Sequence, residues 1–405
     1  MSQTQTQTQT LAERLSANWN YPTQVLVGPG RHRSLPDMCL ERGFRRPLLV
    51  TDPGLRALPM VSDLVAALTT AGLEVGIFSE IKGNPTGEQV EAGVQHYVLG
   101  RHDSVIALGG GSALDCAKAI ALMVGQDRPL WDFEDEGDNW QRVKTEGMAP
   151  VIAIPTTAGT GSEVGRASVI THVQEQRKVI IFHPKMLPAT VLLDGQLCIG
   201  LPPGITAATG MDALSHCMEA FCANYYHPMA EGIALEGMRL IRTYLPRVHK
   251  DGTDLEARQH MLVASAMGAT AFQRGLGGMH AIAHSLGALY DAHHGLLNAV
   301  LMPYILVANR PVVAERMVRL ARLLGLPRHD FDAVLQWVLD LREQLGIPHS
   351  LADMGLPDID LDRVAAMAVC DPSAGGNPVV LAEEEYRQIG LAALNGDLDL
   401  ARVGE

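Results

Sequence analysis

The sequence predicts an α/β half followed by an all-helical half. Short apolar runs alternate with helical patterns up to about residue 198, and beyond that residue only helical patterns follow. Strands and helices that alternate at this spacing are typical of a mostly parallel sheet covered on both faces. A chain of 405 residues exceeds what one core normally organises, so two domains are expected, at 13–198 and 199–405. A cleft between two such domains is a common place for a small-molecule site.

Each expected element has its own local pattern. Strands are predicted at short apolar runs, and helices where apolar residues recur with helical spacing between glycines and prolines. The expected strands cover 24–28, 47–51, 73–78, 104–108, 151–154 and 190–193. The expected helices cover 64–71, 86–99 and 113–124 in the first half, and 205–224, 229–245, 255–272, 279–290, 312–324, 330–345, 360–369 and 382–395 in the second. The polar low-complexity start, MSQTQTQTQT, predicts a disordered tail over residues 1–12.

Composition and charge exclude several classes of protein. Apolar types make up 47% of residues and charged types 19%, as in a globular protein, and the net charge of −13 argues against a broad grip on nucleic acid or anionic lipid. The six cysteines form no C-x-x-C pair, so neither a disulfide framework nor a thiolate zinc site is expected. No signal-peptide pattern is visible, and the longest apolar run, 295–307, contains Asn298 and Pro303 and is too short to span a bilayer. We therefore expect a cytoplasmic, soluble protein without membrane or nucleic-acid partners.

An anion-binding signal lies where the strand at 104–108 runs into Gly109-Gly110-Gly111-Ser112 and then into a helix. Glycines allow the backbone to approach phosphates closely, and the exposed N–H groups and dipole of the helix favour negative charge. The pattern is neither G-x-G-x-x-G nor a Walker motif. A plain tight turn with Ser112 as a helix cap is therefore an equally good interpretation of this segment alone.

Two further segments at strand ends favour a nucleotide site. The run IPTTAGTGSE, from Ile154 to Glu163, offers hydroxyls and glycines that suit hydrogen bonds to ribose, pyrophosphate or a carboxamide, although a polar surface loop has the same composition. The strand at 47–51 leads into Asp52, and an acidic residue there can bind the hydroxyls of an adenosine ribose and repel a 2′-phosphate. This favours NAD over NADP, but an Asp that caps the next turn explains the residue equally well.

Polar residues inside apolar helices indicate a metal site. Asp212 and His216 are four residues apart, as are His280 and His284, so each pair shares one helix face. The segment His293-His294 follows soon after. Carboxylate and imidazole groups in apolar helices are costly unless they are paired or bind metal. Satisfied core histidines explain any one pair, whereas a divalent ion explains all of them together. Asp and His without thiolate suit Fe(II) or Zn(II).

Four longer runs carry a resemblance to a known family. They are GGGSALDCAKAIA, IPTTAGTGSEVGRASVIT, ATGMDALSHCMEAF and GMHAIAHSLGALYDAHHGLLNAVLMPYIL, in this order. In these runs, and over nearly its whole length after the tail, the chain resembles the iron-containing (group III) alcohol dehydrogenases. The resemblance implies an α/β dinucleotide-binding domain followed by an all-α domain, which is the dehydroquinate synthase-like fold, with the active site in the cleft.

The resemblance also implies the residues of the site. One divalent ion, typically iron, would be held by four ligands: Asp212, His216, His280 and His294. Spacing alone also allows His284 or His293 as a ligand, but the resemblance places His284 near the nicotinamide as a proton relay. The expected catalytic residues are therefore His284 together with Asp212 and His280. NAD would be bound by a larger set: Asp52, Asn84, Gly110, Gly111, Ser112, Asp115, Thr156, Thr157, Thr160 and Lys178, the last against the adenosine ribose.

Two departures from the family pattern concern the pocket wall. The histidine motif reads His293-His294-Gly295 instead of Pro-His-Gly. Near the C-terminus, Asp371-Pro372-Ser373 leads to Asn377-Pro378-Val379, where the family often has a cysteine and Asn-Pro-Arg. The four ligands are intact, but the substrate does not follow from the resemblance.

The expected reaction is hydride transfer between NAD and a small primary alcohol or its aldehyde, with the ion stabilising the alkoxide. One alternative is a glycerol-dehydrogenase-like or other polyol or functionalised-aldehyde reductase on the same fold. Others are a dehydroquinate-synthase-like lyase, which shows no net redox, and a non-catalytic NAD or metal sensor. A maleylacetate reductase is disfavoured by the retained Asp212. The family is commonly dimeric or larger, so a homo-oligomer is expected.

Overall fold

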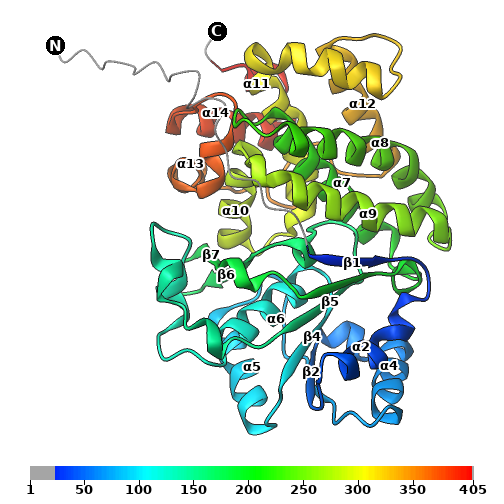
Figure 1. Cartoon of the computed structure of the whole chain (residues 1–405). Coiled ribbons are helices and arrows are strands. Elements are labelled where there is room, and N and C mark those ends of the chain that lie inside the picture. The colour runs from blue at the N-terminus through cyan, green and yellow to red at the C-terminus, as the bar shows by residue number, and fades with distance from the viewer. Residues whose placement is uncertain (1–22, 404–405) are drawn as a thin grey trace.

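The first domain is built on a parallel sheet. The structure is a computed structural model that describes residues 23–403. Six parallel strands lie in the order β1-β8-β5-β4-β2-β3, below a layer of helices in Figure 1. The strands are β1 Gln24–Val27, β2 Pro47–Val50, β3 Gly76–Phe78, β4 Ser104–Gly109, β5 Val151–Pro155 and β8 Thr190–Leu193. Each of these strands lies within its predicted range or extends one residue beyond it. The predicted tail at 1–12 lies outside the described residues.

Helices cover both faces of this sheet, as its sequence pattern requires. Leu48 and Val50 of β2 pack in one apolar cluster with α6, whereas Leu49 packs in another with α2 and α4. Side chains alternate between the faces of a strand, so a strand that is buried throughout needs a covering layer on each side. The layers consist of α5 Gly87–Leu99 and α6 Gly111–Met123 on one face, and α2 Leu35–Glu41 and α4 Pro59–Thr70 on the other. A short helix, α3 Pro53–Arg56, follows β2.

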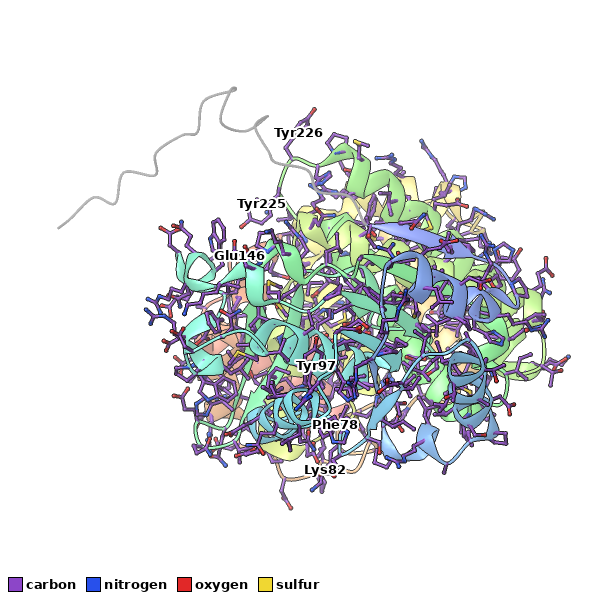
Figure 2. The ribbon with its side chains drawn as sticks, turned by 60° about the horizontal axis from the view of Figure 1, so that its bottom comes forward. Phe78, Lys82, Tyr97, Glu146, Tyr225 and Tyr226 are labelled. Atoms are coloured by element: carbon purple, nitrogen blue, oxygen red, sulfur yellow. The ribbon has the colours of Figure 1, made fainter. Side chains whose placement is uncertain are left out.

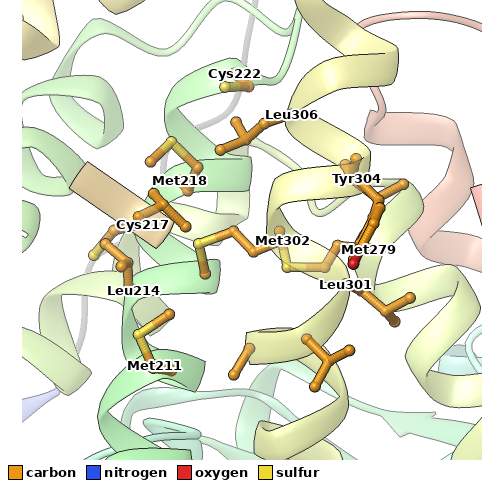
Figure 3. Close-up of a cluster of buried hydrophobic side chains, with 14 of the residues drawn as sticks. Met211, Leu214, Cys217, Met218, Cys222, Met279, Leu301, Met302, Tyr304 and Leu306 are labelled. Atoms are coloured by element: carbon orange, nitrogen blue, oxygen red, sulfur yellow. The ribbon is translucent and has the colours of Figure 1, made fainter. Parts of the chain in front are cut away.

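The second domain is helical. Its helices are α7 Pro203–Cys222, α8 Pro228–Lys250, α9 Leu255–Ala271, α10 Gly278–Tyr290, α11 His294–Leu323, α12 Phe331–Gln344, α13 Leu361–Cys370 and α14 Glu383–Asn395. The core forms where α7 and α11 meet, with side chains such as Leu214, Met218, Leu301 and Met302 interdigitated between them (Figure 3). By length and composition alone α11 could cross a membrane, but 78% of its most apolar window is buried, so it is the central core helix.

Three features differ from the sequence-based expectation. An antiparallel hairpin, β6 Ala167–His172 and β7 Arg177–Phe182, lies in a stretch for which no strand was predicted, because its half-buried strands carry many polar residues. Helix α11 is continuous through Pro303 and Pro311, whereas the prediction began at 312. Burial of most of its length compensates for the amide hydrogen bonds that proline removes. The expected boundary at 198/199 falls just before α7, but Leu262 and Ala266 of α9 join the core of the sheet domain, so the domains pack together.

Candidate active site

The glycine turn after β4 forms the first part of the site. Gly109 has φ +146°, where an L side chain is strained, and a Cβ there would lie 2.8 Å from that of Ala113. Gly110 is the N-cap residue of α6 and no side chain caps the helix, so the interpretation of Ser112 as a cap is wrong. The first N–H groups of α6 therefore have no side-chain acceptor. An uncapped helix N-terminus of this kind suits a phosphate.

A cavity of about 1060 Å³ connects this turn with the helical domain. Eight of the ten predicted cofactor residues line it: Asp52, Asn84, Gly110, Gly111, Ser112, Thr156, Thr157 and Thr160. Its other end is lined by Asp212 and by His293, His294 and Gly295. Lys82, which is exposed at the surface (Figure 2), is the one lysine or arginine among the described residues that line the cavity. A cavity lined by both a phosphate-type turn and a polar cluster suits a dinucleotide site.

The polar residues that line the cavity also hold its walls in place. Asp52 Oδ1 accepts a hydrogen bond of 2.9 Å from the backbone N–H of Leu55. Asp52 therefore caps α3, as the alternative to ribose binding predicted. The same side chain lines the cavity, so capping does not exclude a contact with ribose. Asn84 Nδ2 donates to Asp291 Oδ1 at 2.6 Å and links the sheet domain to the end of α10.

Two predicted cofactor residues lie outside the cavity lining. The Asp115 carboxylate accepts hydrogen bonds from the Ser162 hydroxyl and, at 3.0 Å, from the Val169 backbone N–H, so it braces the second loop against α6. Lys178 on β7 packs against α10, where a Cβ on Gly287 would lie 2.9 Å from its Nζ. Burial lowers the pKa of Lys178 to about 8, and Asp212 opposes the shift most strongly. Lys178 is therefore electrostatically coupled to the metal-ligand cluster.

The structure brings Asp212, His216, His280 and His294 together. One ligand atom from each lies within 4.8 Å of the others, and no thiolate or additional carboxylate belongs to this described group. Asp212 and His216 come from one face of α7, His280 from α10, and His294 from the first residue of α11. Gly295 permits this meeting, because a Cβ there would lie 2.6 Å from the carbonyl oxygen of Ala208 on α7.

The protonation and orientation of these histidines fit a divalent ion. Burial lowers the pKa of His216 to about 4 and that of His294 well below its ordinary value, so both rings are neutral near neutral pH, as ligands must be. The Nδ1 of His216 lies 3.3 Å from the carbonyl oxygen of Gly159, which leaves Nε2 for the cluster. Burial alone would lower the pKa of His280, but Glu219 and Asp212 raise it overall, so this centre favours positive charge.

His284 lies beside the cluster and has a different partner. Its ring centroid is 5.3 Å from that of His294, and its Nδ1 lies 3.0 Å from Asp371 Oδ2. Burial alone would raise the pKa of Asp371, but His284 and the hydrogen bonds from Ser373 lower it overall. The carboxylate therefore accepts the hydrogen on Nδ1, and no hydrogen bond of Nε2 is found among the described residues. His293 instead caps α11, since its Nδ1 accepts from the Leu296 N–H at 3.3 Å.

Comparison with known proteins agrees with this arrangement. The family model described as "Iron-containing alcohol dehydrogenase" matches residues 22–195, and the model described as "Fe-containing alcohol dehydrogenase family, C-terminal" matches residues 206–394. The chain belongs to the iron-containing alcohol dehydrogenase family. It is an NAD-dependent alcohol dehydrogenase that uses a metal and acts on alcohols or aldehydes.

Similar proteins span nearly the whole chain. The 4-hydroxybutyrate dehydrogenase of Cupriavidus necator is 39% identical over 378 residues, which are 91% of this chain and 97% of that protein. The crystal structure of a 1,3-propanediol oxidoreductase superposes with a TM-score of 0.88 at 33% identity and covers 93% of this chain and all of its own (100%). A sulfoacetaldehyde reductase from Bifidobacterium kashiwanohense, solved with NAD+, gives a TM-score of 0.84 at 27% identity and covers 93% of this chain and 98% of its own.

Two residues that the sequence analysis missed hold the ligands of this alcohol dehydrogenase. Glu219 lies on the same face of α7 as His216, and its Oε2 accepts from His280 Nδ1 at 2.7 Å and from the Gly277 N–H at 2.8 Å. Asn298, one turn after His294 on α11, lies within hydrogen-bond distance of three ligands. The spacing of three from His216 would have revealed Glu219. Asn298 was counted only as an interruption of an apolar run.

We expect Glu219→Gln to weaken metal binding by about 10–100-fold, the usual effect of removing the outer partner of a ligand histidine. The amide nitrogen that replaces one carboxylate oxygen cannot accept the hydrogen bonds that Glu219 now receives from His280 and the backbone. The measurement is metal content after dialysis against graded chelator. Glu236→Gln is the control, because Glu236 pairs with Arg239 on the exposed side of α8. Equal metal retention by the two variants would contradict the assignment.

Proposed function

We propose that this chain interconverts a small primary alcohol and its aldehyde, with Fe(II) at Asp212, His216, His280 and His294 and NAD in the cavity. The observation that carries the proposal is the continuity of one cavity from the uncapped N-terminus of α6 to Asp212 and His294. When bound, NAD supplies the hydride acceptor and the ion supplies the positive charge that favours alkoxide over alcohol. Three imidazoles and one carboxylate, without a thiolate, suit Fe(II), and Zn(II) is the alternative.

The cofactor is positioned by the walls of the cavity. The N-terminus of α6 and the loop from Thr156 to Thr160 face the polar backbone of the dinucleotide, and Asp52 faces its adenosine ribose. Lys178 is coupled to Asp212 and lies against α10. We therefore assign it to the nicotinamide half of the cofactor, not to the adenosine ribose that the resemblance suggested.

His284 is proposed as the proton relay. The Asp371 carboxylate holds the hydrogen on Nδ1, so Nε2 can accept the hydroxyl proton as the alcohol is oxidised and return it in the reverse direction. The proximity of His284 to His294 places it at the edge of the ligand cluster, where the reacting oxygen must lie. It therefore acts on the proton and not on the ion.

The proposal extends to the substrate class. Three of the similar proteins are named for short alcohols or aldehydes with a second polar group, namely a carboxylate, a hydroxyl or a sulfonate, whereas a methanol dehydrogenase and a butanol dehydrogenase are named for unfunctionalised alcohols. We infer that this enzyme prefers such a functionalised aldehyde. A lyase that binds a phosphate-bearing substrate needs several cations around the site, whereas Lys82 is the single lysine or arginine among the described lining residues.

A cytoplasmic homo-oligomer is part of the same proposal. All six cysteines are free and five are buried, as suits a reducing compartment. Strand β1 is an edge strand of the sheet, and its Val27 is 46% exposed. An exposed edge strand can be covered by a second copy of the chain.

The function is tested with apoprotein loaded separately with Fe(II) and with Zn(II), by following loss of NADH absorbance. Succinic semialdehyde, 3-hydroxypropanal and sulfoacetaldehyde are compared with propanal and butanal. We expect saturable turnover with higher kcat/KM for the functionalised aldehydes and faster turnover with Fe(II). Full binding of metal and NADH without turnover of any aldehyde would identify a sensor instead. A preference for unfunctionalised aldehydes would refute the substrate class.

The roles of the two histidines in α10 are separable. His280→Ala should lose metal and activity together, because it removes a ligand from the cluster. His284→Ala should keep its metal and lower kcat by about 10²–10⁴-fold, as expected when a proton relay is removed. Metal content and kcat are measured on the same preparations. A metal-free His284→Ala protein would refute this division.

Asp52→Ser tests the preference for NAD. Serine can still cap α3, so the turn is retained, but the negative charge that repels a 2′-phosphate is removed. We expect KM for NADP to fall while kcat with NAD and the unfolding temperature change little. An unchanged ratio of the two KM values would place the adenosine ribose elsewhere.

A further inference from the structure

Asn298 is inside the ligand cluster without being one of the four ligands. It is 0% exposed, and its Nδ2 lies 2.9 Å from Asp212 Oδ1, 3.2 Å from His280 Nε2 and 3.1 Å from His294 Nε2. One amide group is thus within hydrogen-bond distance of three of the four ligand side chains. It approaches both imidazoles at Nε2, and in His280 this is the nitrogen left available because Nδ1 is bonded to Glu219.

The chemistry of these groups is complementary. A carboxylate oxygen and an unprotonated imidazole nitrogen are acceptors, and acceptors crowded together in a buried site repel one another. The amide nitrogen of Asn298 carries two hydrogens that can be shared among them. When an ion occupies the imidazole lone pairs, Asp212 Oδ1 remains as an acceptor for this amide.

The environment of Asn298 indicates that this side chain does more than fill space in the core. Its neighbours on α11, Leu297 and Ala299, are apolar and fully buried, and an apolar residue would pack there without cost in hydrogen bonds. Asn298 Oδ1 has no hydrogen-bond partner among the described residues, which is unfavourable in a buried site. Asn309, farther along the same helix, pairs both ends of its amide with Asn377. Asn298 is therefore held by its donor side, which faces the ligands.

His294 depends on this contact more than the other two imidazoles do. The Nδ1 of His216 has the Gly159 carbonyl as a partner, and that of His280 has Glu219. The Nδ1 of His294 is buried without a partner in the described part of the chain. The hydrogen bond that the structure shows for its ring is the one between Nε2 and Asn298.

We propose that Asn298 is a positioning residue of the metal site. Its amide holds Asp212, His280 and His294 together before the ion binds and then holds Asp212 through Oδ1 once the imidazoles bind the ion. This inference rests on the metal site of the proposed function. It adds to that site an amide that sets the affinity and the geometry of the ligand set.

The test compares Asn298→Leu and Asn298→Asp with Asn309→Leu, which removes an equally buried amide from the same helix. Co(II) is the probe, because its visible spectrum reports the coordination geometry. Its Kd is measured by competition with a chelator, and unfolding temperatures are measured with and without Co(II). We expect Asn298→Leu to raise Kd by about 10–100-fold and to change the visible spectrum.

Asn298→Asp should increase the stabilisation of the protein by the metal, whereas Asn298→Leu should decrease it. A second carboxylate beside Asp212 should lower the unfolding temperature of the metal-free protein, and the ion should then raise it by more than in the wild type. The Asn309→Leu control should lower both unfolding temperatures equally and leave the spectrum unchanged. If Asn298→Leu does not fold, the metal-induced stabilisation of Asn298→Asp tests the proposal.

Two negative results are distinguishable. Normal Co(II) binding by the wild type, with the same Kd and spectrum in Asn298→Leu and the same metal-induced stabilisation in Asn298→Asp, would overturn the role of Asn298 alone. A wild-type protein that binds neither Co(II), Fe(II) nor Zn(II) would overturn the proposed function with it.

Discussion

The arrangement of the helical domain depends on four buried side chains that offer lone pairs at one point. Asp212, His216, His280 and His294 place their ligand atoms within 4.8 Å of one another, at the meeting of α7, α10 and α11. Buried polar groups are costly without partners, so each wall of the site must supply some. The Gly159 carbonyl, the Glu219 carboxylate and the Asn298 amide do so from three different elements. The apolar packing of Figure 3 joins α7, α10 and α11, which carry the four ligands.

The same cluster explains the charge distribution of the cleft. Asp212 and Glu219 raise the pKa of His280, whereas burial lowers the pKa of His216 and His294. The carboxylates therefore stabilise positive charge near His280, and the two neutral imidazoles offer lone pairs to a divalent cation. The other end of the cleft offers anions the uncapped N–H groups of α6, with Lys82 as the single lysine or arginine among the described lining residues. A net charge of −13 is thus compatible with binding a dinucleotide.

The sequence was informative where one local pattern decided the outcome. Apolar runs placed all six strands of the sheet, and the two spacings of four residues, with the resemblance, placed the residues that meet at the ligand cluster. It failed where tertiary packing overrides local preference. The prolines of α11 suggested a break, so the apolar run was not read as a helix and Asn298 was not recognised as one turn from His294. The resemblance gave Asp115 as a cofactor residue, and its hydrogen bonds to Ser162 and Val169 are visible only in three dimensions.

The second loop connects the two halves of the site. Buried Lys118 on α6 donates to the carbonyl of Ser162 at 2.9 Å and also to that of Ala167 at the start of β6, and Asp115 binds the same loop. The loop is therefore fixed to the helix that presents the phosphate-binding N-terminus. Its Gly159 carbonyl contacts the ring of His216. Hydrogen bonds of this loop thus connect α6 with His216, so the two ends of the proposed site share one structural support.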